Sequence, residues 1–379
     1  MPNTLTGISR DAWKAADMIG RELTGAIPSV TLNAGLQAVP KGETVKSVFT
    51  RQPTLNTSLT PSMTIPEGDN QTFDVKNVSL DLVANVMIPW EGEEIRKVDN
   101  AQGFSTVYGD QLAQAFRTIV NQIEIGLCAE IYKNASRAVG TAGTTPFASN
   151  LDVIAEGRKI LVDNGTPDDG MWTLLFDTTA GVKFRNLTQN QKVNEAGTDQ
   201  LIRRGTLLQT QGFNCKESAG IRTHTKGTGA SYLLNGAVAA AGKALTLDTG
   251  SGTILQGDIV TLAGDANKYC VNSALASNIV TIGEPGLLAA GADNTALTVG
   301  NSFTPNSFFH RNAVELAVRP WADPPGGDAA VDTMIIQDPL TGIPFEVKLY
   351  KGFKKMLLSI TVLYGYKVWK PNFVGVLLG

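Results

Sequence analysis

The sequence predicts an α+β fold, and three observations carry that prediction. The first is an amphipathic helix over residues 105–137, and the second is a strand over 78–88 in which apolar residues fill every other position. The third is a segment over 225–302 that is rich in Gly, Ala and Thr and sparse in charge. Together they predict a helical spine, a long β-hairpin and a small β-barrel inserted in a larger mixed domain.

The chain begins with a predicted amphipathic helix over residues 8–23, followed by a polar arm to about residue 44. A helix this short is marginal alone, so we expect it to dock on this subunit or on another. Residues 45–88 predict a two-stranded hairpin with a Pro- and Gly-rich tip at 60–71. An isolated two-stranded ribbon is marginal in water, so we expect the hairpin to contact a neighbouring subunit.

The predicted spine helix has one apolar stripe with steps of three and four residues. Its members are Leu112, Phe116, Ile119, Val120, Ile123, Leu127 and Ile131. Gly126 lies inside the helix and costs about 1 kcal/mol relative to Ala, so packing must hold the helix. We expect Gly140 and Gly143 to end it. At 1.5 Å per residue the helix spans roughly 50 Å, the length of a spine with other elements laid along it.

The rest of the chain predicts alternating helices and strands, and then mostly strands. Helices are expected over 150–162 and 178–189, and strands over 171–176 and 209–224. The barrel strands are expected at 244–247, 254–262, 268–271 and 278–282, with a helix or strand at 308–318 and a loop at 321–328. Strands over 345–350 and 356–368 predict a covered sheet, and the apolar residues 373–379 are expected to be packed.

Composition bounds the class of protein. With 42% hydrophobic and 18% charged residues, the 379-residue chain is predicted to be ordered, with two or three domains. The net charge of -3 argues against a strong general binder of nucleic acid. Three distant cysteines predict no disulfide framework and a reducing compartment. Residues 1–11 lack the apolar core of a signal peptide and the run 356–364 is too short to span a bilayer, so we expect assembly in the cytosol and no membrane partner.

No pattern of catalytic or metal-binding residues stands out. His224 and His310 are the only two histidines, and neither has the Cys or carboxylate spacing of a metal site. Gly236 and Gly242 fail the spacing of a phosphate loop, and the aspartates over 163–169 lack the spacing of a calcium loop. The sequence therefore predicts no enzyme, no metal and no cofactor.

Charge on the predicted hairpin is unevenly placed. Lys41, Lys46 and Arg51 lie near its base, and Glu67 and Asp69 lie at its tip. These five residues are candidate intersubunit contacts, because an acidic tip suits a ribbon that reaches a basic patch on a neighbour. Ordinary solubilising charge explains the same pattern, and both interpretations stay open.

The order of predicted elements resembles the HK97 fold of tailed-phage major capsid proteins, and the inserted barrel makes it similar to the P22-like coat proteins. Four stretches carry the likeness in their residues. They are residues 73–80 (FDVKNVSL) followed by ANV at 84–86, residues 255–264 (LQGDIVTLAG), residues 308–320 (FFHRNAVELAVRP), and residues 363–368 (LYGYKV) followed by KP at 370–371. The likeness runs over nearly the whole chain, and the order of the stretches is its specific part.

The resemblance implies a division of the chain. Residues 1–44 correspond to the N-arm and 45–90 to the extended loop. The peripheral domain corresponds to 91–145 with 331–379, including the spine helix at 105–137. The axial domain corresponds to 146–224 with 303–330, and the insertion domain to 225–302, which is short for the P22 type.

The resemblance also implies a function. The expected product is an icosahedral shell of pentamers and hexamers around double-stranded DNA, built with a separate scaffolding protein and a portal protein. Such a protein belongs to the virion and is assembled in the host cytoplasm. Residues 52–75 contain no lysine, so we expect a non-covalent shell. Asp17 and Glu22 on the N-terminal helix are candidate contacts for basic groups of the scaffolding protein.

Two alternatives come from other classes of protein. One is an encapsulin-like compartment of the same fold, which the inserted barrel disfavours. The other is a β-rich phage tail or adhesion module, which the long helical spine disfavours. A hydrolase is more distant still, because the sequence shows no nucleophile–base pair.

Overall fold

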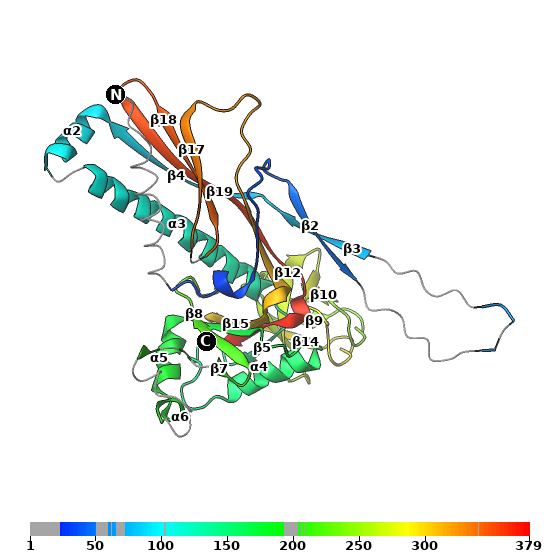
Figure 1. The fold of residues 1–379 in the computed structure, drawn as a ribbon. Coiled ribbons are helices and arrows are strands. Elements are labelled where there is room, and N and C mark those ends of the chain that lie inside the picture. The colour runs from blue at the N-terminus through cyan, green and yellow to red at the C-terminus, as the bar shows by residue number, and fades with distance from the viewer. Residues whose placement is uncertain are drawn as a thin grey trace.

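The computed structural model describes residues 23–50, 60–61, 63–65, 73–101, 104–192, 204–205, 207, 209–339 and 341–379. They form an α+β fold in which one long helix lies along a six-stranded sheet and leads to a twelve-stranded sheet (Figure 1). The α-helices are α2 (Gly92–Ala101), α3 (Phe104–Lys133), α4 (Asp152–Asp163), α5 (Thr178–Asn186) and α6 (Thr188–Gln191). Short 3-10 turns are η2 (Ile27–Ser29), η3 (Arg311–Ala313) and η4 (Pro371–Phe373).

The predicted spine helix is confirmed as α3. Every member of its predicted apolar stripe is buried, and Phe116 meets Phe345 of the sheet edge-on, with ring centroids 4.8 Å apart. A Cβ on Gly126 would lie only 2.6 Å from the hydroxyl of Tyr366, so close packing explains this glycine. The helix ends at Lys133, four residues before the predicted boundary, because Arg137 already begins strand β5.

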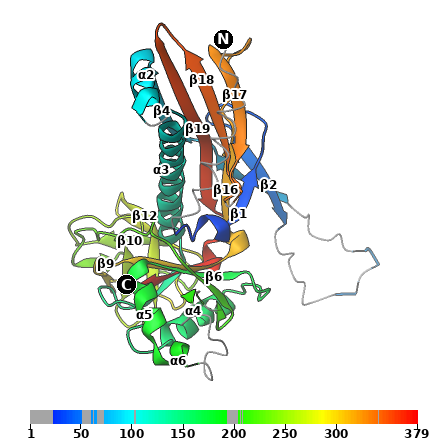
Figure 2. The same cartoon turned by 60° about the vertical axis from the view of Figure 1, so that its left-hand side comes forward.

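The six-stranded sheet packs one face on α3 (Figure 2). Its strands follow the order β1 (Thr31–Ala34), β16 (Val314–Arg319), β19 (Lys355–Val368), β18 (Pro344–Lys351) and β17 (Ala330–Gln337), and β4 (Leu82–Glu91) also pairs with β19. The strands predicted at 345–350 and 356–368 are thereby confirmed as β18 and β19. The segment 308–318, whose pattern fitted a helix or a strand, forms strands on both sides of η3.

Two predictions for the N-terminal third are wrong. The strand predicted over 78–88 is two strands, because the chain turns at Leu80 and Asp81. The first, β3 (Phe73–Ser79), pairs with β2 (Thr44–Thr50), whereas β4 pairs with β19. The arm expected to be polar up to residue 44 also contributes to the core, because β1 pairs in parallel with β16 and residues 26, 27 and 30 are buried. The helix predicted over 8–23 lies almost wholly outside the described residues.

The twelve-stranded sheet contains a closed ring of six strands. The ring runs β11 (Ile259–Leu262), β14 (Ala296–Val299), β9 (Tyr232–Leu234), β10 (Ala244–Asp248), β13 (Ile279–Ile282), β12 (Lys268–Ala276) and back to β11. It encloses its own apolar core, so the barrel strands predicted in this segment are found. The ring is not detached, because β12 also pairs with β5 through Lys268↔Ala138 and Tyr269↔Arg137.

Beyond β12 the sheet continues as an open half. Its order is β5 (Arg137–Gly140), β20 (Val374–Leu378), β15 (Pro305–His310), β6 (Trp172–Phe176), β8 (Phe213–Glu217) and β7 (Gln209–Thr210). Helices α4 and α5 contribute to the apolar core on this part of the sheet, and both were predicted. The packed C-terminal segment is confirmed, since every residue of β20 is buried. Strand β20 therefore lies in a different sheet from β19, although only the five residues 369–373 separate them.

Candidate interaction surfaces

The β2–β3 hairpin is anchored at its base and projects from the two sheets (Figure 1). Its strands pair from Thr44↔Ser79 to Thr50↔Phe73, and among the described residues they pair with no other strand. At the base, Val78 and Leu80 are buried against residues 317 and 363 of β16 and β19. The direction of the hairpin is therefore set by the packed sheet beneath it.

Two further contacts brace this base. A Cβ on Gly365 in β19 would overlap the carbonyl oxygen of Ser79, so only glycine lets β3 approach β19 this closely. On β3, Lys76 Nζ donates to the carbonyl of Trp369 at 2.7 Å and lies 5.6 Å from the centroid of its ring. A hydrogen bond and a cation–π contact thus hold one strand of the hairpin to the segment after β19.

The structure places only part of the predicted contact set. Lys41 is exposed just before β2, and Lys46 is exposed on β2 opposite Asn77, so both lie at the base of the hairpin as expected. The other predicted contacts lie outside the described residues, and they are Arg51, Glu67, Asp69, Asp17 and Glu22. Their roles stay predictions.

Large apolar side chains are exposed beyond the base of the hairpin. Met63 and Ile65, in the connection between β2 and β3, are 105% and 89% exposed, and Val75 on β3 is 52% exposed. Exposed apolar residues on one projecting element make the hairpin a candidate surface for contact with another molecule. The sequence pattern identified the hairpin but did not single out these side chains.

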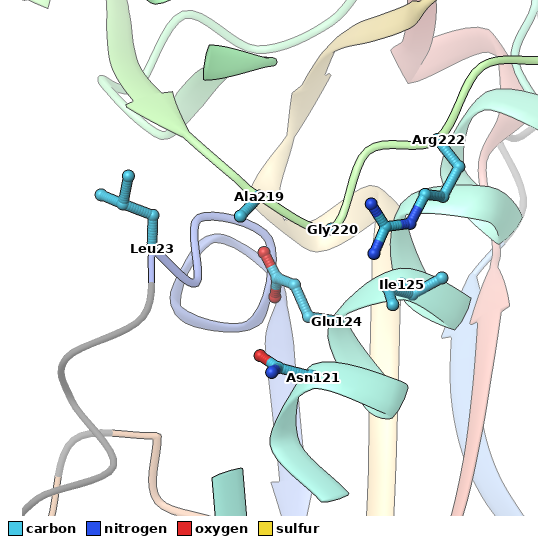
Figure 3. Close-up of a pocket in the computed structure, with 7 residues that line it drawn as sticks. All are labelled: Leu23, Asn121, Glu124, Ile125, Ala219, Gly220 and Arg222. Atoms are coloured by element: carbon cyan, nitrogen blue, oxygen red, sulfur yellow. The ribbon is translucent and has the colours of Figure 1, made fainter. Parts of the chain in front are cut away.

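A buried carboxylate joins the N-terminal arm to the spine helix (Figure 3). Glu124 of α3 is 1% exposed and accepts hydrogen bonds from Ala26 N at 2.7 Å and Ile27 N at 2.9 Å. The hydroxyl of Ser218 donates to the same carboxylate at 2.6 Å. These three donors satisfy the buried charge, so Glu124 ties the arm, the helix and the segment after β8 together.

Sequence reasoning missed Glu124, although a signal was present. Glu124 follows Val120 by four residues and precedes Leu127 by three. Those steps place it on the apolar stripe itself. A carboxylate on a buried stripe indicates that buried hydrogen-bond donors surround it. The sequence pattern does not identify these donors, because they come from segments about 95 residues before and after Glu124.

A pocket of about 500 Å³ lies beside Glu124, and Figure 3 shows its lining. The residues around it are Leu23, Asn121, Glu124, Ile125, Ala219, Gly220 and Arg222. The thiol of Cys128, on the same helix as Glu124, lies 3.8 Å from the hydroxyl of Ser218. Burial, and then the charge of Glu124, raise the pKa of this thiol well above its usual value. A protonated, buried thiol is a packing group and not a reactive one.

The two histidines hold structural hydrogen bonds. His224 lies between Asp258, whose Oδ1 is 2.8 Å from Nε2, and the hydroxyl of Tyr132, which is 3.2 Å from Nδ1. Burial raises the pKa of Tyr132 to about 12, with Cys270 and Asp258 adding to the shift. His310 pairs with Asp169, whose oxygens lie 3.0 and 3.1 Å from Nε2. Each histidine thus hydrogen-bonds to a different aspartate, His224 to Asp258 and His310 to Asp169.

A network of carboxylates surrounds a buried lysine on the sheet face opposite α3. Lys348 Nζ binds Glu346 at 3.1 Å, Asp328 at 3.3 Å and also Asp323. Burial opposes the charge of Lys348, but its bonds to Asp323 and Glu346 raise its pKa above the usual range. Burial raises the pKa of Glu346, although Lys348 lowers it. The network pins the loop after Pro320 onto the sheet and lines a cleft of about 360 Å³.

Within the described part of the chain, no group of three His, Cys, Asp or Glu side chains is placed to hold a metal ion. The three cysteines are free and buried. No described helix has the length and apolarity needed to cross a membrane.

Comparison with known proteins gives matches among solved structures. The sequence matches no protein-family model and no curated protein. The capsid of cyanophage P-SCSP1u aligns at 12% identity and a TM-score of 0.49, over 94% of this chain and 88% of that one. A structure from Mycobacterium phage Che8 aligns at 13% and 0.46, over 89% and 85%. A virus-like particle from Pyrococcus furiosus aligns at 8% and 0.41, over 97% and 96%.

Proposed function

We propose that this protein is a phage major capsid protein, which assembles with copies of itself into an icosahedral shell around double-stranded DNA. The observation that carries the proposal is the β2–β3 hairpin, which is braced at its base and presents fully exposed apolar side chains at Met63 and Ile65. A braced apolar ribbon stabilises a protein only when another molecule covers it. A second copy supplies such a surface at every position of a closed lattice.

The order of elements supports the same assignment. The arm is followed by the projecting hairpin, the spine helix α3, a mixed region carrying the ring β9–β14, and the strands β17–β20. This order supports the assignment because it is the order expected from the resemblance to the HK97 fold. The ring falls within residues 225–302, which we propose form a P22-like insertion domain. In these terms 45–90 is the extended loop, 91–145 with 331–379 the peripheral domain, 146–224 with 303–330 the axial domain, and 225–302 the insertion domain.

The resemblance also implies how the shell is built. The shell consists of pentamers and hexamers, a separate scaffolding protein guides assembly, and a portal protein occupies one vertex. The protein meets DNA without sequence-specific contacts, since its net charge is -3. Each contact need bury only about 1,200–2,000 Å², because many modest contacts add in a closed lattice.

Electron microscopy of the protein, expressed alone and with its candidate scaffolding protein, tests this function. We expect closed shells with pentamers and hexamers, and a single band of monomer mass from those shells on a denaturing gel. A ladder of linked subunits would overturn the non-covalent shell alone. A monodisperse monomer under both conditions would overturn the capsid assignment, and shells that fill with another protein in place of DNA would favour an encapsulin-like compartment.

The exposed apolar residues of the hairpin allow a more specific test of self-assembly. Changing both Met63→Ser and Ile65→Ser is expected to reduce the yield of shells at least about tenfold, because each removes an apolar anchor worth more than about 1 kcal/mol. The melting temperature of the unassembled subunit should not change, since neither side chain contacts the core. Val182→Ser on α5, where an apolar side chain is 56% exposed away from the hairpin, is the matched control and should assemble normally.

A further inference from the structure

The turn between β18 and β19 presents an aromatic residue to solvent. Phe353 is 90% exposed, and Lys351, Lys354 and Lys355 around it are exposed as well. Lys354 Nζ lies 5.7 Å from the centroid of the Phe353 ring. Residues 351–355, called the knob below, lie at the end of the molecule farthest from the ring β9–β14 (Figures 1 and 2).

The turn itself does not require an aromatic side chain. It is closed by Gly352 N, which donates to the carbonyl of Lys355 at 2.9 Å, and by the left-handed backbone of Lys354 at φ 57°. Polar residues and glycine satisfy such turns at no cost in exposed apolar surface. Lysines beside an exposed ring keep the unassembled subunit soluble, and an exposed aromatic residue is the side chain most often found at the centre of a protein interface.

A groove large enough to admit a phenylalanine side chain lies between β4 and α3. Its volume is about 550 Å³, and the residues lining it, called the socket below, are Val86, Met87, Ile88, Pro89, Asp110, Gln111, Gln114, Ala115 and Thr118. Met87 is 60% exposed, and Trp90 Nε1 donates to Gln111 Oε1 at 3.0 Å beside it. Among the described residues β4 pairs only with β19, so its other edge is open along the socket.

Apolar character and charge make the knob and the socket complementary. The socket is mostly apolar, as a phenylalanine ring requires, and the exposed carboxylate of Asp110 lies on its wall. Glu93 and Glu94 in the exposed first turn of α2 follow β4 directly and add negative charge near the socket. The knob carries three lysines, of which Lys355 already pairs with Glu91 of its own chain at 2.6 Å.

We propose that the knob of one copy inserts Phe353 into the socket of a second copy, with Lys354 facing Asp110. This contact rests on the proposed self-assembly and adds a specific pair of surfaces to it. The knob is exposed in its own chain, so it does not fill its own socket. A knob-to-socket contact is head-to-tail and leaves a free knob and a free socket at its two ends, so it propagates to further copies as a ring or lattice requires.

Charge exchange tests the contact in the full-length protein. Phe353→Ser is expected to lower the yield of assembled particles about tenfold, the effect of losing about 1.4 kcal/mol at each contact, whereas Phe353→Trp should stay within about twofold of wild type. Lys354→Asp and Asp110→Lys should each lower the yield, and the double variant should recover it to within about threefold. The melting temperature of the unassembled subunit, followed by circular dichroism, should match wild type in all five variants.

A disulfide trap tests the geometry independently of yield. Phe353→Cys combined with Met87→Cys is expected to give linked copies on a non-reducing gel, and Phe353→Cys combined with Val182→Cys should not. The knob-to-socket contact would be overturned if wild type forms particles, Phe353→Ser forms them at the same yield, and no disulfide link is trapped. That outcome would leave the capsid function intact. No assembly of wild type under any condition would overturn the capsid function, and this contact with it.

Discussion

Replacing Glu124 with alanine is expected to lower the free energy of unfolding by about 3–5 kcal/mol. The carboxylate is buried, and its loss leaves Ala26 N, Ile27 N and the Ser218 hydroxyl without their acceptor. Each unsatisfied buried donor costs about 1–3 kcal/mol, and a new cavity adds to the sum. Urea denaturation followed by circular dichroism measures the change.

The location of the effect can be tested as well as its size. The amides of Ala26 and Ile27 should lose protection from hydrogen exchange in Glu124→Ala, because their acceptor is gone. Glu124→Gln should fall between wild type and alanine, since its amide keeps one acceptor oxygen but turns two donors toward the same site. Gln122→Ala, on an exposed position of the same helix, should change stability by less than about 0.5 kcal/mol. If Glu124→Ala lowers the free energy of unfolding by less than about 1 kcal/mol, Glu124 does not stabilise the fold by accepting these three hydrogen bonds.

Gly365→Val is expected to destabilise the subunit by about 2–3 kcal/mol and to release the hairpin from its fixed direction. A Cβ at this position overlaps the carbonyl oxygen of Ser79 and lies 3.0 Å from its carbonyl carbon. Both obstacles are backbone, so β3 must move away from β19. Denaturant unfolding gives the free energy, and shell yield should fall with it because the apolar side chains of the hairpin no longer meet a neighbour in register.

Gly109→Ala is the matched control for Gly365→Val. Gly109 lies in α3, and a Cβ there meets no described atom within 4 Å. Alanine in a helix interior is favoured over glycine by about 1 kcal/mol, so this change should raise the free energy of unfolding. Equal effects of the two substitutions would show that the close approach of β3 and β19 is not what requires glycine at residue 365.

The sequence predicted those parts of the fold that depend on local periodicity. The stripe of α3 and the alternation in β18 are determined by neighbours a few residues away, so their burial followed from the pattern. The pattern did not reveal the turn at Leu80 and Asp81, because apolar residues alternate with the same phase through it. Val78 is buried before the turn, Leu80 is buried within it, and Ile88 is packed after it. Strand β1 was missed because four residues gain strand structure only from pairing with β16, about 280 residues away.

The candidate surfaces were predicted less completely than the fold. Lys41 and Lys46 lie where the charge pattern placed them, but the importance of Phe353 and Met63 depends on exposure. A single apolar residue in a short connection has the same sequence pattern whether it is buried or exposed. Only the path of the surrounding strands decides this, and that path is set by pairings between distant segments.

The position of β20 has a consequence for the time at which a subunit can form. This strand lies between β5 and β15 and pairs with both of them, so it joins the half of the sheet that contains the ring to the half that contains β6 and β8. A ribosome synthesises β5 more than 230 residues before it reaches β20. Until β20 is synthesised, no strand connects the two halves of the sheet, even if the ring and α3 have already folded. A nascent chain therefore cannot complete the twelve-stranded sheet until residues 374–378 have been synthesised.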